Sequence, residues 1–167
     1  MHVSGLKLRN RRAGLPSSTL LLFLLAALVA GCRTPPPLPP ADLSAPGWRV
    51  QQGQAIWKPT RTRPELAGEL LCATNANGNF FVQFSKPPFN LATAQMINGQ
   101  WQIEFGNNVR RWTSRGEPPS RFAWLQLSRA LSGATLKNNW RFTGTAPDAW
   151  CLENSRTGEI LEGGFFP

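Results

Sequence analysis

The sequence predicts a mainly β domain, in which a curved antiparallel sheet carries one amphipathic helix on its concave face. Two observations predict the sheet: short segments after Trp48 alternate apolar and polar residues, and glycine-containing turn signals separate them. One observation predicts the helix, because residues 118–133 repeat their apolar side chains at helical spacing. A helix must bury its apolar stripe, so the concave face of the sheet is its expected place.

The strand-like segments follow one another along the chain, and we expect them to form six to eight antiparallel strands. In residues 79–85, for example, Phe80, Val82 and Phe84 share one face of the strand. The segments are 47–51, 54–58, 66–74, 79–85, 89–97, 101–106, 139–144, 149–155 and 159–166.

Turn signals separate these segments and pair them into hairpins. Asn98-Gly99 is the strongest, because both residues tolerate the positive φ of a two-residue hairpin turn. Residues 75–78, Asn-Ala-Asn-Gly, and the pair Thr157-Gly158 are further turn signals. Lys86-Pro87-Pro88 ends the strand before it. The sequence therefore predicts consecutive antiparallel hairpins.

The predicted helix lies in residues 118–133, PPSRFAWLQLSRALSG. Two prolines stand at its front and a glycine at its back, an asymmetry typical of helix ends. Trp124, Leu127 and Leu131 occupy positions i, i+3 and i+7 and form an apolar stripe. We expect about three helical turns, inserted between the fifth and sixth strands.

The N-terminal segment resembles a bacterial lipoprotein signal. A basic stretch without acids precedes the apolar run Leu20 to Ala30, which is shorter than the roughly 20 residues of a membrane-spanning helix. Small residues then precede Cys32, as in a lipobox, in which the cysteine is acylated and the chain is cut just before it. We expect residues 1–31 to be a removed signal peptide and Cys32 to carry lipid. An ordinary signal peptide cut elsewhere and an uncleaved anchor are the alternatives.

The segment that follows contains six prolines in residues 33–47, which favours an extended polyproline conformation. At about 3.1 Å per residue it would span roughly 45 Å. We assign residues 32–47 to the lipidated cysteine and a proline-rich tether, and 48–167 to one β-rich globular domain. A docking ligand for another protein is the alternative role of the prolines.

The formal charge of +9 overstates the basicity of the mature chain. Four of the 18 lysines and arginines lie in the predicted signal and none of the nine acids does, which leaves 14 basic and nine acidic side chains, or +5. These basic residues are scattered rather than gathered in a stripe, and a secreted protein does not meet nucleic acid. We expect no nucleic-acid partner and a solvated basic surface near anionic lipid.

The mature chain lacks the residues of most catalytic and metal sites. Its only histidine, His2, lies in the predicted signal, which excludes a serine–histidine or cysteine–histidine couple. Cysteines without histidine do not complete a tetrahedral zinc site. Glu153, Glu159 and Glu162 form the only local group of acids, so a carboxylate pair for glycoside hydrolysis is the remaining catalytic alternative to exposed strand positions. We expect no enzyme activity, no metal and no cofactor.

Two cysteines remain in the domain, Cys72 and Cys151, both in predicted strands. An oxidising compartment permits a disulfide between them, whereas two separate buried thiols fit the sequence equally well.

Aromatic residues are abundant in the mature chain. All seven tryptophans and nine of the ten phenylalanines lie there. A core of this size uses some of them, and their number also suits the lining of an apolar cavity. Core packing alone and a core with a cavity therefore remain two alternatives.

The order of elements resembles the LolA/LolB type of outer-membrane lipoprotein carrier and receptor. The resemblance lies in the hairpins 67–85 and 87–105, the proline-led helix 118–133, and the strands in 138–142 and 149–163. It implies an unclosed, barrel-like sheet with a helical lid over an apolar cavity for acyl chains. It also implies a role in placing lipoproteins. Arg33 after the lipid cysteine is not the aspartate that retains lipoproteins in some inner membranes, so the outer membrane, facing the periplasm, is the expected location.

Three functional hypotheses follow. The first is a lipid-anchored protein that binds acyl chains of lipids or lipoproteins in a cavity. The second is a structural or assembly lipoprotein that contacts another envelope protein, and the third is a glycan-binding module that uses Trp57 or Trp112 as a stacking platform. For the first, the residues expected around the cavity are Phe80, Val82, Phe84, Trp101, Ile103, Phe105, Trp124, Leu127 and Leu131.

Overall fold

A computed structural model describes residues 36–106, 110–137, 139–144 and 148–167 of the chain. The predicted signal peptide, residues 1–31, and the predicted lipid site, Cys32, lie outside the described residues. Within the described part of the chain, no helix is both long and apolar enough to cross a bilayer.

The described chain forms nine strands and one helix. The helix, α2, spans Ala123–Leu131. The strands are β1 (Trp48–Lys58), β2 (Leu66–Asn75), β3 (Phe80–Lys86), β4 (Phe89–Ile97), β5 (Gln100–Phe105), β6 (Arg110–Arg115), β7 (Trp140–Gly144), β8 (Trp150–Asn154) and β9 (Ile160–Phe165).

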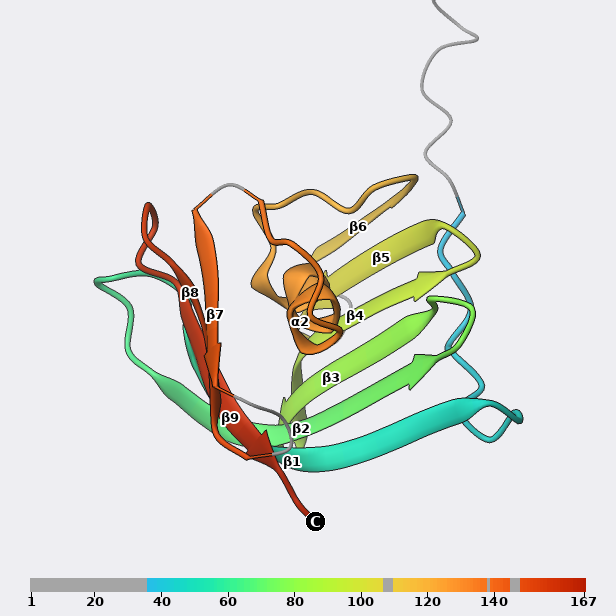
Figure 1. Ribbon diagram of the computed structural model, residues 1–167, viewed down its shortest axis with the longest axis horizontal. Coiled ribbons are helices and arrows are strands. Elements are labelled where there is room, and N and C mark those ends of the chain that lie inside the picture. The colour runs from blue at the N-terminus through green and yellow to red at the C-terminus, as the bar shows by residue number, and fades with distance from the viewer. Residues whose placement is uncertain (1–35, 107–109, 138, 145–147) are drawn as a thin grey trace, which may run out of the picture. The chain divides into compact units, whose positions relative to one another are not determined.

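All strands belong to one antiparallel sheet in the order β6-β5-β4-β3-β2-β1-β9-β8-β7. The last strand, β9, returns to pair with the first, so β1 lies in the middle of the sheet. The sheet curls without closing, because its edge strands β6 and β7 are not neighbours in this order. Helix α2 lies in the chain between these two edges and sits inside the curl (Figure 1). The predicted mainly β fold, with a curved antiparallel sheet and one helix packed against it, is confirmed.

The structure corrects three details of the predicted elements. The segments predicted as two short strands, 47–51 and 54–58, form one continuous strand, β1. Strand β6 is additional, so the helix follows the sixth strand rather than the fifth. Within the predicted segment 118–133, the helix begins only at Ala123, well after the two prolines, because Phe122 adopts an extended conformation, with φ of −108° and ψ of 110°.

The predicted hairpin turns lie where the sequence placed them. Asn98 and Gly99 both have positive φ, 51° and 73°, as a two-residue turn of the primed type requires. In the turn after β2, the side-chain oxygen of Asn75 accepts hydrogen bonds from the backbone of Asn77 and Asn79. These turns bring consecutive strands into the paired registers that carry the core side chains on one face.

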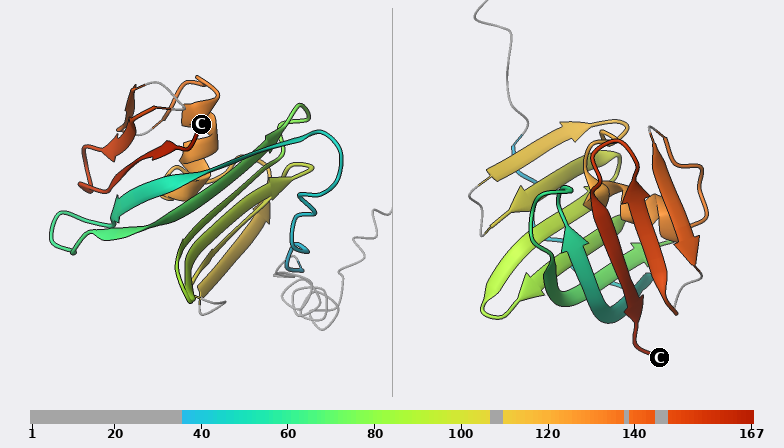
Figure 2. Two further views of the ribbon diagram at one scale, coloured as in Figure 1. Left: turned by 90° about the horizontal axis from the view of Figure 1, so that it is seen from below. Right: turned by 90° about the vertical axis from the view of Figure 1, so that its left-hand side faces the viewer.

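A row of small residues lies on the concave face where the sheet bends. Gly68, Ala55 and Gly163 lie opposite one another on β2, β1 and β9. A Cβ atom at Gly163 would clash with the backbone carbonyl of Gln54, and one at Gly68 would clash with that of Ser85. The views of Figure 2 show the sheet turning through this region. Glycine therefore permits the close strand approach that gives the sheet its curl.

We expect Gly163→Val to destabilise the fold, because the new side chain must displace the neighbouring strand. Overpacking of this kind costs roughly 1–3 kcal/mol, and urea unfolding of the unlipidated chain from Arg33 onward measures it. Gly78→Asn is the control, since no atom lies within 4 Å of a Cβ at Gly78 and asparagine tolerates its positive φ. Equal unfolding midpoints for the two variants would contradict the role of the small-residue row.

Candidate functional site

The nine residues predicted to line a cavity all come together on the concave face. Those from β3 alternate with less buried residues along their strand, and together with those from β5 and α2 they belong to one hydrophobic core. Phe105 and Leu131 are partly buried, and the other seven are part of the buried core. The structure thus gathers the predicted set at one place, and a role for it in ligand binding stays a prediction.

Helix α2 lies above small side chains on β4. Ala92 pairs with Phe84 and Phe105 on the neighbouring strands, and Ala94 pairs with Val82 and Ile103. The two alanines are buried and leave a trough between larger side chains. This trough admits the helix, whose principal contacts with the sheet are to β4.

Aromatic rings fill the space between α2 and the sheet. The ring of Trp124 on α2 stacks on Phe84 of β3 at 5.0 Å between centroids, and Trp57 of β1 meets Trp124 edge-on at 5.5 Å. Such pairs add about 0.5–1.5 kcal/mol each beyond the area they bury. We call the connected rings the aromatic layer. Its members are Trp57, Phe84, Trp101, Phe105, Trp112, Phe122 and Trp124.

The polar contacts of α2 side chains stay within the loop that carries the helix. Arg129 binds Glu117 at 2.9 Å and the carbonyl of Thr135, and Gln126 reaches the carbonyl of Pro119 at 3.5 Å. For the described residues, no α2 side chain forms a hydrogen bond or ion pair with a strand. The N-terminus of the helix has neither a side-chain cap nor an acid in its first turn. Apolar packing is therefore what holds α2 against the sheet.

Two indole N–H groups of the aromatic layer lack a hydrogen-bond acceptor. Trp101 and Trp124 are 7% and 1% exposed, and within the described chain no acceptor lies in reach of either Nε1. Trp150, in a second ring cluster with Phe142 and Phe165, has the same deficit. A buried donor without a partner costs about 1–3 kcal/mol. Each group offers a hydrogen bond to any acceptor that enters the core.

A partly buried acid borders the aromatic layer. Trp57 donates a hydrogen bond of 3.0 Å from its indole N–H to Glu159 Oε1. Burial of the Glu159 carboxyl raises its pKa to about 7, although the bond from Trp57 acts in the opposite direction. Nearby, Arg61 packs against Gly158 and donates to the carbonyl of Ser155. The rim of the core therefore holds a carboxyl group that changes charge near neutral pH.

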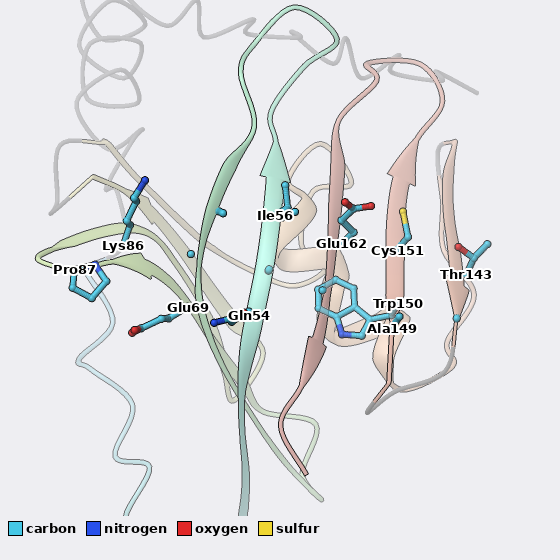
Figure 3. Close-up of a pocket in the computed structure, with 15 residues that line it drawn as sticks. Gln54, Ile56, Glu69, Lys86, Pro87, Thr143, Ala149, Trp150, Cys151 and Glu162 are labelled. Carbon is cyan, nitrogen blue, oxygen red and sulfur yellow. The ribbon is translucent and has the colours of Figure 1, made fainter.

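A groove of about 860 Å³ crosses the outer face of the sheet over β2, β1, β9 and β8. Ile56, Glu162 and Cys151 lie opposite one another along its floor (Figure 3). Burial raises the pKa of the Cys151 thiol, and the charges of Glu162 and Glu153 raise it further. The thiol therefore stays protonated, which suits a packing role rather than a nucleophile.

The two cysteines of the domain are free thiols. Cys72 faces the core from β2, where burial raises its pKa to about 12, whereas Cys151 faces the outer groove from β8. Strands β1 and β9 separate them. Of the two alternatives left by the sequence, the structure contains separate thiols.

The three neighbouring acids of the sequence do not converge. Glu159 contacts the Trp57 ring on the concave side, whereas Glu162 lines the outer groove and Glu153 is exposed on β8. Among the described residues, no group of three or more histidine, cysteine or acidic side chains is placed to hold a metal ion.

Several residues of the site were not predicted from the sequence. Trp57 and Trp112, proposed there as exposed glycan platforms, are half-buried in the aromatic layer. Phe122, in an extended conformation before the helix, packs its ring against Phe105 of β5 and Trp112 of β6. Strand β6, RRWTSR, carries a single apolar residue, so it offered no alternating pattern. The hydrogen bond to Glu159 depends on long-range strand pairing, which no local motif reports.

Protonation of Glu159 predicts a pH-dependent stability. The folded state binds this proton more tightly than the unfolded state, so the free energy of unfolding falls as pH rises from about 4.5 to about 7. Glu159→Gln removes this dependence and keeps an acceptor for Trp57. We expect the variant to be more stable than the wild type near pH 8 by roughly 3 kcal/mol, and nearly equal near pH 5. Urea unfolding across this pH range measures the difference, with Glu162→Gln as the exposed control. A wild-type stability that stays flat over this range would contradict the assignment.

Comparison with known proteins adds no family to this description. Neither the scan against protein-family models nor the search of curated proteins found a match for the chain. The resemblance to the LolA/LolB type stays a prediction, and the functional argument rests on the geometry of the concave face.

Proposed function

We propose that this chain is a lipid-anchored protein of the bacterial cell envelope that holds acyl chains between α2 and the concave face of its sheet. In this proposal Cys32 carries the anchor, the protein faces the periplasm from the outer membrane, and the acyl chains belong to lipids or lipoproteins. The single observation that carries the proposal is the aromatic layer, which joins α2 to the sheet without a polar contact from helix to strand.

Displacement of α2 would expose an apolar trough of suitable chemistry. The trough has alanines on its floor and aromatic rings along its sides. An acyl chain recovers about 0.8 kcal/mol for each methylene buried, so roughly ten methylenes supply about 8 kcal/mol. A buried leucine or tryptophan that leaves the core loses about 2–3 kcal/mol. The free energy gained by burying one acyl chain is therefore close to the free energy lost when a few helix side chains leave the core. Reversible binding requires such a small difference.

The indole donors of Trp101 and Trp124 support an ester or carboxyl group beside the chain. An acyl chain ends in a carbonyl, and a carbonyl oxygen accepts a hydrogen bond that would satisfy a buried N–H. Without a ligand, an unpaired indole N–H adds no stability to the folded core. The aromatic layer thus provides both parts of the recognition, an apolar wall and a donor.

A second candidate function is an assembly lipoprotein that contacts another envelope protein. The outer groove favours it, because exposed Ile56 stands there among Glu69, Lys86 and Glu162. A glycan-binding role is less favoured, because the rings of Trp57 and Trp112 pack against other aromatic rings rather than standing free.

Lipid extraction tests the proposal directly. The unlipidated chain from Arg33 onward is purified, extracted with organic solvent and analysed by mass spectrometry, and its binding of a fluorescent fatty acid is titrated. We expect co-purified phospholipid or fatty acid and saturable binding. Recovery of no lipid together with no binding would leave the assembly role as the better account.

Trp124→Phe tests the hydrogen-bond part of the proposal. The change keeps an aromatic ring, removes the N–H and enlarges the space for a ligand, so a purely apolar site would bind as tightly or tighter. We expect affinity for the fluorescent fatty acid to fall about fivefold, the equivalent of one hydrogen bond of about 1 kcal/mol.

Trp150→Phe is the matched control for this variant. It removes the same unpartnered indole N–H from the second ring cluster, whose ring contacts within the described chain do not include Trp124, and should leave affinity within about twofold. Urea unfolding of both variants corrects for lost stability. Equal affinities in the two variants would show that the Trp124 donor takes no part in binding.

A further inference from the structure

Part of the proline-rich segment is bound to the outer face of the sheet. We call residues 36–40 the strap. The backbone N–H of Leu38 donates to Gln102 Oε1 at 2.7 Å, Gln95 Nε2 donates to the carbonyl of Pro39 at 3.1 Å, and Gln100 Nε2 donates to that of Pro36 at 3.3 Å. The strap therefore crosses β5 and β4, and by its contacts it belongs to the same compact unit as the sheet.

The sheet provides a built site for the strap. Gln95 and Gln102 lie on the face opposite the core, yet they are only 3% and 5% exposed. Gln102 also donates to Glu104 at 2.8 Å, and Glu104 accepts from Arg111 of the edge strand β6. A polar network of this kind gains strength from each bond and fixes its members in one arrangement. The outer face thus holds the strap through side chains that would otherwise be solvated.

We propose that the strap shortens the tether and sets one end of the sheet against the anionic surface of the bilayer. This inference rests on the lipidation of Cys32 in the proposed function. Four residues, 32–35, precede the strap, and an extended chain covers at most about 3.5 Å per residue. The anchor therefore lies within roughly 14 Å of Pro36, in place of the roughly 45 Å that a free segment 32–47 allows.

The strap leaves the sheet at the end formed by the β2–β3 and β4–β5 turns. Gln100, which holds Pro36, pairs with Arg115 at the end of β6, and the Asn98 N–H donates to Asn79 across the two turns. Strand β1 begins beside Asn75 at the same end. Figure 1 shows residues 36–47 passing these turns on their way to β1. This end of the sheet is therefore the one nearest the anchor.

The charge of this end suits anionic phospholipid headgroups. Arg49 and Arg115 are exposed there, and Arg33 precedes the strap in the chain. Two acids are near: Glu117 is already bound by Arg129 and Lys137, and Asp42, between the strap and β1, accepts hydrogen bonds from the backbone and hydroxyl of Ser44. Attraction between basic side chains and a negative membrane surface acts within a Debye length of about 10 Å. The short anchor keeps these arginines near that distance, whereas a free tether would let the domain move beyond it.

The test uses the full lipidated protein on bilayers of phosphatidylethanolamine and phosphatidylglycerol. Neutron reflectometry measures the gap between headgroups and domain, and hydrogen exchange on the same sample reports the Leu38 amide. We expect a gap below about 15 Å and a protected amide in the wild type. Gln95→Ala with Gln102→Ala should widen the gap and expose the amide, whereas Gln83→Ala, a change at another outer-face glutamine beside the strap, should do neither.

Charge reversal tests the orientation separately. Arg49→Glu with Arg115→Glu should widen the gap while the Leu38 amide stays protected, and Arg63→Glu in the β1–β2 turn should leave the gap unchanged. An unprotected Leu38 amide, or a wild-type gap that the glutamine substitutions do not alter, would overturn this inference alone. A chain without lipid at Cys32 in the mass spectrum would overturn the anchoring on which both proposals rest.

Discussion

The packing of Trp124 on Phe84 is the contact on which the rest of this structure depends. It fastens α2 to strand β3 of a curled sheet whose edges β6 and β7 do not pair. An unclosed sheet leaves its concave face exposed unless another element covers it, and here a helix of nine residues does so. Because no polar contact joins the α2 side chains to a described strand, apolar packing of Trp124, Leu125 and Leu127 is what keeps the concave face covered.

Two constraints in the strands make this contact possible. Glycine and alanine at Gly68, Ala55 and Gly163 let neighbouring strands approach at the bend, and the alanines of β4 leave space for the helix beneath the bend. Larger side chains at either place would flatten the sheet or expel α2. The small residues therefore determine the shape, and the large aromatic residues fill it. The proposed function depends on two properties of this packed region of the described chain: apolar contacts alone hold the helix side chains against the strands, and two indole N–H groups lack acceptors.

Much of the fold was predictable because its signals are local. Asn98-Gly99 specifies a hairpin turn by its backbone preferences, the alternation in β3 specifies a buried face, and the spacing of Trp124, Leu127 and Leu131 specifies a helix. The missed features depend on distant parts of the chain. Strand β6 forms because it pairs with β5, and Phe122 is extended because its ring packs among three other rings. The raised pKa of Glu159 depends on its burial beside Trp57, which is 102 residues away in the chain. The nine residues predicted to line a cavity belong to one hydrophobic core, and their periodicity does not distinguish a permanently filled core from one that opens to a ligand.

Hydrogen exchange of the α2 amides tests the central claim most directly, because it measures whether the helix leaves the sheet while the sheet stays folded. Native-state exchange of the unlipidated chain, followed at increasing urea, gives an opening free energy for each segment. We predict that α2 opens at a free energy well below that of β2, β3 and β4, and that a bound fatty acid changes the exchange of α2 without changing that of these strands. Exchange of α2 only through global unfolding, with the same free energy as the strands, would contradict the account.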